Sequence, residues 1–180
     1  MTPAIVSFAA KSGTGKTTLV VKLITELKRR GYRVGAIKHD AHNFSMDQEG
    51  KDSWRFTEAG ADTMLVTSQE KLAMIKRNPE NREPSVQDSI DRYFSDVDIV
   101  LTEGFKKHDL PKIEVHRRDC RKELLYRGRD LDPTLIAIAS DEPLDVDIPV
   151  FDLNDAAALC DFIVQRFLDR APDSTGTGAR

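Results

Sequence analysis

One segment of the chain has residue types and spacing that suit the binding of nucleotide phosphates. Residues 10–17 read A-K-S-G-T-G-K-T and match G-x-x-x-x-G-K-[ST], except that Ala10 stands where the first glycine is expected. The glycines permit a tight turn that brings backbone N–H groups close to phosphate oxygens. An alanine with negative φ would fit the same turn, and a glycine-rich turn without a ligand is the structural alternative. The residues expected to contact the nucleotide are Gly13, Thr14, Gly15, Lys16, Thr17 and Thr18.

Two of these side chains have specific chemistry available to them. The Lys16 ammonium can reach the β- and γ-phosphates, and the Thr17 hydroxyl can bind Mg²⁺. The positive end of the helix that starts near Gly15 faces the same phosphates. This segment therefore predicts a site for a nucleoside triphosphate with Mg²⁺.

A carboxylate follows a second hydrophobic strand, predicted at residues 98–102. Glu103 lies at the end of that strand where P-loop proteins place a second metal-site group, so Thr17 and Glu103 are the predicted metal residues. Gly104 would let the backbone approach the γ-phosphate. Lys16 and Glu103 are the predicted catalytic pair, with a solvated loop acid as the alternative for Glu103. Asp98 is at the wrong end of the strand and is expected to be a cap or surface residue.

An aspartate follows a late apolar strand, predicted at residues 134–139. A carboxylate there suits guanine, because guanine N1 and N2 both donate hydrogen bonds whereas adenine N1 accepts one. Asp141 is therefore predicted to read the base. A simple turn is the alternative, since aspartate and proline are frequent turn residues.

Polar residues also follow the second strand, at the edge where ligands bind in open α/β sheets. Lys38 and His39 are predicted to contact a phosphate or another anionic ligand. His39 and His42 have the weak metal spacing H-x-x-H, with Asp40 or Asp47 nearby, and an ordinary polar loop is the third interpretation.

A basic run comprises Arg117, Arg118, Arg121 and Lys122. Such runs are usually solvated faces, and an anionic cofactor or acidic partner is the functional alternative.

Strand and helix patterns alternate along the chain and must position these groups. Residues 4–10 and 33–38 form apolar strands, and residues 17–30 between them carry a helical apolar stripe. Further strands are predicted at residues 63–67, 71–75, 98–102, 112–115, 134–139 and 150–152. Further helices are predicted at 52–59, 84–94 and 154–168, the first capped by Asp52 or Ser53 and the last by Asn154.

This alternation predicts an α/β, three-layer P-loop NTPase fold with a mainly parallel sheet. A length of 180 residues suits one domain, placed at residues 1–170, with a disordered polar tail at 171–180. The net charge of −3 gives no basic footprint for nucleic acid. The absence of a long apolar run and of a signal sequence predicts a cytoplasmic protein without a membrane span.

Several motifs in this order resemble the MobB family. They are S-G-T-G-K-T-T, I-K-H-D-A-H at residues 37–42, G-K-D-S-W-R-F at 50–56, A-G-A at 59–61, T-E-G-F-K at 102–106 and K-I-E-V at 112–115. The phosphate loop alone is widespread, but the ordered combination is much more specific, and the resemblance covers residues 4–168.

The resemblance implies a GTP-binding adapter of molybdopterin-guanine dinucleotide (molybdenum cofactor) biosynthesis. Such proteins bind GTP with Mg²⁺, hydrolyse it slowly, form homodimers and assist the molybdopterin guanylyltransferase, with the pterin cofactor as a further ligand to consider. From the residues alone, a P-loop small-molecule kinase and a binding module without turnover remain alternatives.

Overall fold

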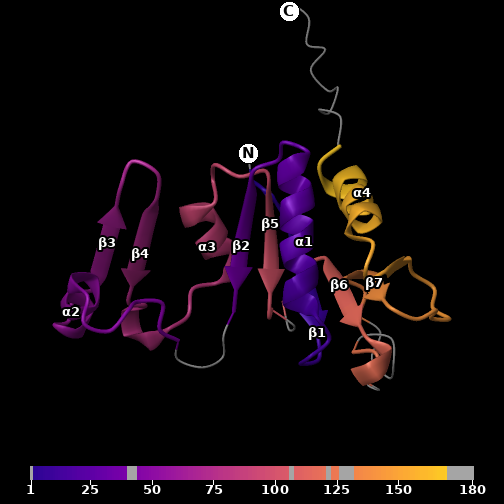
Figure 1. Cartoon of the computed structure of the whole chain (residues 1–180), viewed down its shortest axis with the longest axis horizontal. Helices are drawn as coiled ribbons and strands as arrows, with labels where there is room; N and C mark the ends of the chain where they lie inside the picture. The colour runs from indigo at the N-terminus through magenta and orange to yellow at the C-terminus, as the bar shows by residue number, and fades with distance from the viewer. Residues whose placement is uncertain (1, 40–43, 106–107, 121–122, 126–131, 170–180) are drawn as a thin grey trace, which may run out of the picture. The chain divides into compact units, whose positions relative to one another are not determined.

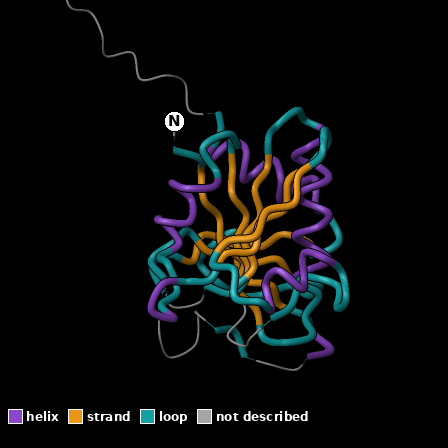
Figure 2. Tube along the Cα trace, turned by 90° about the vertical axis from the view of Figure 1, so that its left-hand side faces the viewer, coloured by secondary structure: helices purple, strands orange, loops and turns teal. Residues whose placement is uncertain are grey.

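The computed structural model describes residues 2–39, 44–105, 108–120, 123–125 and 132–169. The chain divides into two compact units, one formed by residues 1–39 with 90–180 and the other by residues 40–89. Figure 1 labels their elements, and Figure 2 shows in colour which segments are helices, strands and loops. The predicted tail at 171–180 lies outside the described residues.

The first unit is built on a six-stranded sheet in which every neighbouring pair is parallel. Its strands lie in the order β2-β5-β1-β6-β7-β8. Their bounds are Ala4–Ala10 for β1, Val34–Lys38 for β2, Ile99–Glu103 for β5, Lys112–His116 for β6, Leu135–Ser140 for β7 and Val150–Asp152 for β8. Because all strands run the same way, the residues that follow them gather at one edge of the sheet.

Helices alternate with the strands along the chain, and the helix at residues 52–58 belongs to the second unit. Their bounds are Lys16–Arg29 for α1, Asp52–Glu58 for α2, Val86–Tyr93 for α3 and Ala156–Phe167 for α4, with short 3-10 turns η1 at Pro79–Asn81 and η2 at Arg118–Cys120. No helix among the described residues is long and apolar enough to cross a membrane.

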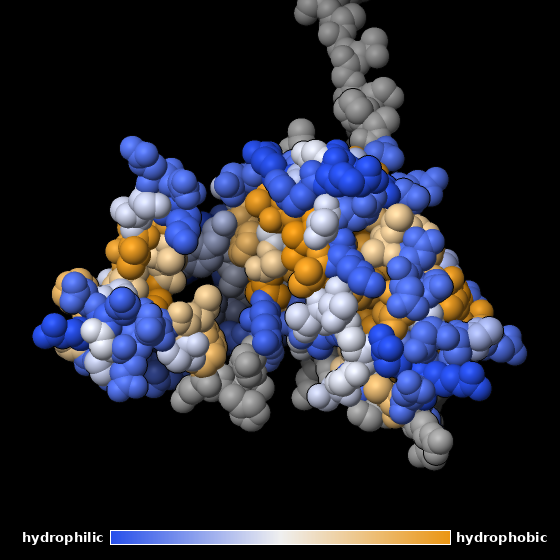
Figure 3. All heavy atoms as spheres, in the orientation of Figure 1, coloured by the Kyte–Doolittle hydropathy of each residue, from blue (hydrophilic) through white to orange (hydrophobic). Residues whose placement is uncertain are grey.

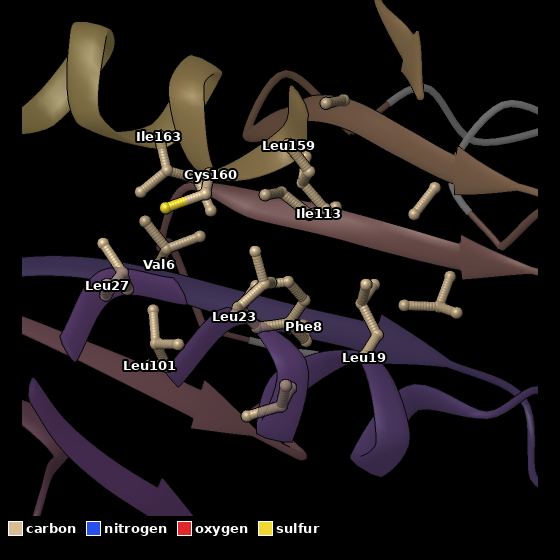
Figure 4. Close-up of a cluster of buried hydrophobic side chains, with 14 of the residues drawn as sticks. Val6, Phe8, Leu19, Leu23, Leu27, Leu101, Ile113, Leu159, Cys160 and Ile163 are labelled. Carbon is tan, nitrogen blue, oxygen red and sulfur yellow. The ribbon is translucent and has the colours of Figure 1, made fainter. Parts of the chain in front are cut away.

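The main core lies between one face of the large sheet and helices α1 and α4. Leu19, Leu23 and Leu27 from α1 meet Phe8 of β1 and Leu159 of α4, and all are essentially inaccessible to solvent (Figure 4). Full burial of each such side chain stabilises the fold by about 1.5–3 kcal/mol. The apolar spacing predicted from the sequence therefore positions α1 and, with it, the loop at its N-terminus.

The opposite face of the sheet carries a third layer. The alternation of strand side chains turns Val100 away from the α1 face, and Phe94, which directly follows α3, packs there. A Cβ at Gly35 would lie 2.4 Å from the Phe94 ring, so glycine makes room for that ring. Helices thus cover both faces, and the predicted three-layer α/β fold is confirmed.

A buried ion pair also lies on this sheet. Lys112, 3% exposed, places its Nζ 3.2 Å from Asp132 Oδ2 and 2.6 Å from Thr134 Oγ1, and it also donates to the carbonyl of His108. Burial raises the pKa of Asp132, but hydrogen bonds from Thr134 and Lys112 outweigh it and hold that pKa below its usual range. The lysine thereby ties two connecting segments to the sheet.

The second unit contains an antiparallel hairpin of β3, Thr63–Thr67, and β4, Leu72–Lys76. Leu65 pairs with Met74 and Thr67 with Leu72 in register, and Leu65, Leu72 and Met74 are all exposed. The hydrophobic surface of this hairpin is visible in Figure 3.

The observed bounds follow the predicted ones to within a few residues, but two predicted caps are wrong. The side chain of Asp155, not Asn154, accepts the N–H of Ala158 at the start of α4. Helix α2 starts after Lys51 without a side-chain cap, and Asp52 is its first residue. Asp98 caps no described helix, and it instead accepts the Arg33 N–H at 2.6 Å beside the start of β2.

Candidate functional site

The predicted phosphate loop connects the buried strand β1 to helix α1. Gly13 and Gly15 have φ values of 84° and 87°, in the left-handed region that favours glycine. Gly15 is also the N-cap of α1, so the free N–H groups of a 14-residue helix open directly onto the loop. The loop conformation and the helix end together form an anion-binding surface.

Ala10, the one departure from the glycine pattern, fits this loop without strain. It is the last residue of β1 and is 2% exposed. Among the described residues only Glu80 and Asn81 combine a side chain with a positive φ. Ala10 therefore has a negative φ, the condition under which an alanine fits the turn in place of glycine.

The sheet places Glu103 directly beside the phosphate loop. Strand β5 pairs with β1, and Glu103 lies opposite Phe8, two residues before the loop begins. Its Oε1 is 3.3 Å from Lys16 Nζ, and its Oε2 accepts the Thr17 hydroxyl at 3.1 Å. The three predicted residues therefore converge, with Lys16 and Glu103 each 17% exposed.

These oxygens fit a magnesium ion. Mg²⁺ is usually held by one or two protein oxygens, with phosphate oxygens and waters completing the octahedron. Thr17 and Glu103 supply one hydroxyl and one carboxylate within reach of each other. No cluster of three or more His, Cys, Asp or Glu suited to a metal occurs among the described residues.

Gly104 and His39 bring the end of β2 against the end of β5. The His39 N–H donates to the Glu103 carbonyl at 2.8 Å, and Lys38 is the register partner of Glu103. Gly104 has φ 110°, and a Cβ there would be 2.8 Å from the His39 carbonyl oxygen. The His39 ring lies 5.1 Å from the buried Phe105 ring. Lys38 and His39 thus lie beside Glu103 at the carboxyl edge of the sheet.

The metal interpretation of the loop after β2 stays a prediction. Asp40 and His42 lie outside the described residues. Asp47 instead accepts hydrogen bonds from the Ser53 hydroxyl at 3.0 Å and the Gln48 N–H at 2.8 Å. Asp47 therefore shapes the turn before α2.

Asp141 lies at the same edge of the sheet, after β7. Its Oδ1 accepts the Arg118 N–H at 2.8 Å, and its Oδ2 lies 3.8 Å from Arg117 Nη1. Glu142, the next residue, bonds His116 Nε2 at 2.8 Å. Asp141 and Glu142 thus hold the end of β6 and the residues that follow it. The sequence did not predict these contacts.

Arg117 was predicted only as part of a basic run, but its side chain contacts the phosphate loop. Its Nε donates to the Thr14 carbonyl at 3.2 Å, and its Nη2 is 3.1 Å from where a Cβ on Gly15 would lie. Arg118 is 77% exposed and matches a solvated face, while Arg121 and Lys122 lie outside the described residues. An arginine directly after a strand at the carboxyl edge was the available sequence signal.

These residues surround the point where the chain changes direction across the sheet. From β1 the chain crosses to β2 on one side, and from β5 it passes over β1 to β6 on the other. Open α/β sheets bind ligands at such a switch point, beyond the carboxyl ends of the strands. A small pocket there is lined by Lys11, Thr14, His116, Arg117 and Cys120 among others. Fold and loop together place this protein in the class of P-loop NTPases.

Comparison with known proteins gives the family. Residues 5–141 match the model of the family described as "MobB: Molybdopterin guanine dinucleotide synthesis protein B". This match spans well over half of the chain, and the protein belongs to the MobB family.

Curated relatives and solved structures agree with that assignment. The molybdopterin-guanine dinucleotide biosynthesis adapter protein of Escherichia coli is 42% identical, with 89% of this chain and 91% of that protein covered. The Haemophilus influenzae adapter protein is 40% identical, with 84% and 83% covered. The crystal structure of Bacillus subtilis MobB superposes with a TM-score of 0.71 at 26% identity, covering 93% of this chain and 99% of that one.

Proposed function

We propose that this protein binds GTP with Mg²⁺. The convergence of Lys16, Thr17 and Glu103 at the end of β1 is the observation that carries the proposal. Lys16 would exchange its ion pair with Glu103 for the β- and γ-phosphates, which carry more negative charge. Glu103 and Thr17 would then be left to hold Mg²⁺, which neutralises charge on the phosphates.

Asp141 supports guanine as the base. It follows β7 at the ligand-binding edge, and its carboxylate is partly exposed. A carboxylate offers about four lone-pair positions over its two oxygens, so while Oδ1 accepts the Arg118 N–H the two oxygens together can still accept from guanine N1 and N2. Adenine would present an acceptor to the same oxygens, which disfavours ATP.

Slow hydrolysis of GTP fits this set of groups. Phosphoryl transfer to water requires positioning and charge neutralisation rather than a protein nucleophile, and Lys16 and Glu103 provide these. The Arg117 side chain donates a hydrogen bond to the Thr14 carbonyl of the phosphate loop. An arginine held in that way stabilises the loop more than the transferring phosphoryl group.

An adapter role in molybdopterin-guanine dinucleotide biosynthesis is the function that the relatives support. The E. coli and H. influenzae proteins are both named as adapters, and each aligns over at least 83% of its own length. We infer that this protein likewise assists the guanylyltransferase that attaches GMP to molybdopterin. Lys38 and His39, beside Glu103, are the residues we expect near a pterin or its phosphate.

A homodimer is the assembly that we propose. An isolated two-stranded hairpin is marginally stable in water, and the β3–β4 hairpin exposes Leu65, Leu72 and Met74. Apolar groups gathered on one element favour burial against another chain. A second copy of this protein would provide that surface.

Calorimetric titration with GTP and, separately, with ATP in the presence of Mg²⁺ tests the nucleotide proposal. We expect GTP to bind at least tenfold more tightly, a difference of about 1.4 kcal/mol. Asp141→Asn should remove most of that preference, because an amide can donate as well as accept. Equal affinity for the two nucleotides would refute the guanine assignment. Release of phosphate over many cycles would exclude a binding module without turnover.

A further inference from the structure

The segment that follows β6 contacts the reverse side of the phosphate loop. Arg117 Nε donates to the Thr14 carbonyl at 3.2 Å, and Cys120 Sγ lies 3.6 Å from the Gly13 carbonyl oxygen. In return, Lys11 Nζ donates to the Glu123 carbonyl at 2.7 Å. The loop is thus held by the side chains of Arg117 and Cys120 and the backbone of Glu123, all more than 100 residues away in the sequence.

Arg117 and Cys120 both contact backbone carbonyls of the phosphate loop, and this determines how the N–H groups of the loop are oriented. In a trans peptide the C=O and the following N–H point in opposite directions. The Gly13 and Thr14 carbonyls belong to the peptides that carry the Thr14 and Gly15 N–H groups. A donor on those carbonyls therefore fixes the two N–H groups toward the side where phosphates bind.

The charge of Arg117 adds to this geometric effect. A cation that donates to a carbonyl polarises the peptide and makes its N–H a stronger donor, because hydrogen bonds in a chain reinforce each other. The guanidinium occupies the space beside Gly15, where a Cβ would lie only 3.1 Å from Nη2. Glycine at this position therefore admits the arginine as well as permitting the positive φ.

Arg117 is itself held from the other side. Its Nη1 lies 3.8 Å from Asp141 Oδ2, and the Arg118 N–H donates to Oδ1 of the same carboxylate. Only 37% of the Arg117 side chain is exposed. The guanidinium therefore connects the phosphate loop to the carboxylate that we expect to read the base.

We propose that Arg117 is a positioning residue that orients the N–H groups of the phosphate loop and couples them to Asp141. The proposal rests on the proposed nucleotide-binding function. Its consequence is that Asp141 contributes to binding the phosphates even when no base is present. A carboxylate that only read guanine would have no such effect.

Inorganic tripolyphosphate with Mg²⁺ is the probe that isolates this effect, since it has phosphates but no base. Calorimetry would compare the full-length protein with Arg117→Gln, Arg117→Lys and Asp141→Ala. Arg118→Gln is the matched control, because it removes the same charge from the next residue, whose side chain is 77% exposed. Circular dichroism would establish that each variant is folded.

We expect Arg117→Gln to weaken tripolyphosphate binding roughly tenfold, the effect of losing one charge-assisted hydrogen bond. Arg117→Lys should retain more affinity, because it keeps a charged donor for Thr14. Asp141→Ala should weaken tripolyphosphate binding measurably, and Arg118→Gln should leave it within about twofold of the unmodified protein.

The outcomes separate this proposal from the proposed function. If the unmodified protein binds neither GTP nor tripolyphosphate, the nucleotide-binding function itself is refuted. If it binds both and Arg117→Gln binds tripolyphosphate equally well, only the positioning role is refuted. Equal losses of tripolyphosphate affinity in Arg117→Gln and Arg118→Gln would also refute the positioning role, because the loss of one positive charge near the site would then explain the effect.

Discussion

Substitution of Gly104 by alanine tests whether the close approach of β2 and β5 shapes the site. At φ 110° a side chain costs about 1–3 kcal/mol in backbone strain. The new Cβ would also lie 2.8 Å from the His39 carbonyl oxygen and 3.0 Å from the His39 Cβ. Overpacking against a backbone that cannot rotate away adds roughly 1–3 kcal/mol, so we expect a total loss of about 4 kcal/mol.

Gly31→Ala is the matched control within the same unit. Gly31 has φ 91°, but a Cβ there would meet no atom within 4 Å. Its substitution should cost only the left-handed strain of about 1–2 kcal/mol. The effect of alanine on the unfolded chain is common to both variants and cancels in the comparison.

Urea unfolding measures the two free energies, and calorimetry with GTP and Mg²⁺ measures the site. Gly104→Ala should be about 2 kcal/mol less stable than Gly31→Ala, or roughly 4–8 °C lower in Tm. It should also bind GTP more weakly, since relief of the contact moves Glu103 or His39, whereas Gly31→Ala should bind normally. Equal stability of the two variants would show that the contact with His39 does not constrain this turn.

Three further perturbations address other parts of the molecule. Lys16→Ala should abolish GTP binding in calorimetry while circular dichroism stays unchanged, and unaltered affinity would overturn the site assignment. Asp132→Asn should destabilise the protein to urea above about pH 4, because the pKa of Asp132 is lowered in the fold and its ionised form pairs with buried Lys112. That difference should shrink as the pH falls through the folded-state pKa, and a difference independent of pH between 7 and 3 would contradict it. If the proposed homodimer forms through the β3–β4 hairpin, Leu72→Asp should make the protein monomeric by light scattering, whereas Val21→Asp, at a similarly exposed apolar position on α1, should not change its mass.

The sequence by itself determined the local chemistry of this protein. Gly13, Gly15, Lys16 and Thr17 lie within five consecutive residues, so their spacing sets their geometry without help from distant parts of the chain. The apolar runs and the helical stripe around them predicted the strand, loop and helix for the same reason. Glu103 was identifiable because an acid at the end of a hydrophobic strand is itself a local pattern.

Only the tertiary structure decided which distant residues meet this loop. Strand order does not follow from periodicity, yet it places β5 on one side of β1 and β6 on the other. The position of Arg117 directly after a strand placed it at the carboxyl edge of the sheet, but the sequence did not show that its side chain contacts a loop carbonyl 103 residues away while that of Arg118 is exposed. Such contacts depend on how the strands pair across the sheet, and the local sequence does not determine that pairing.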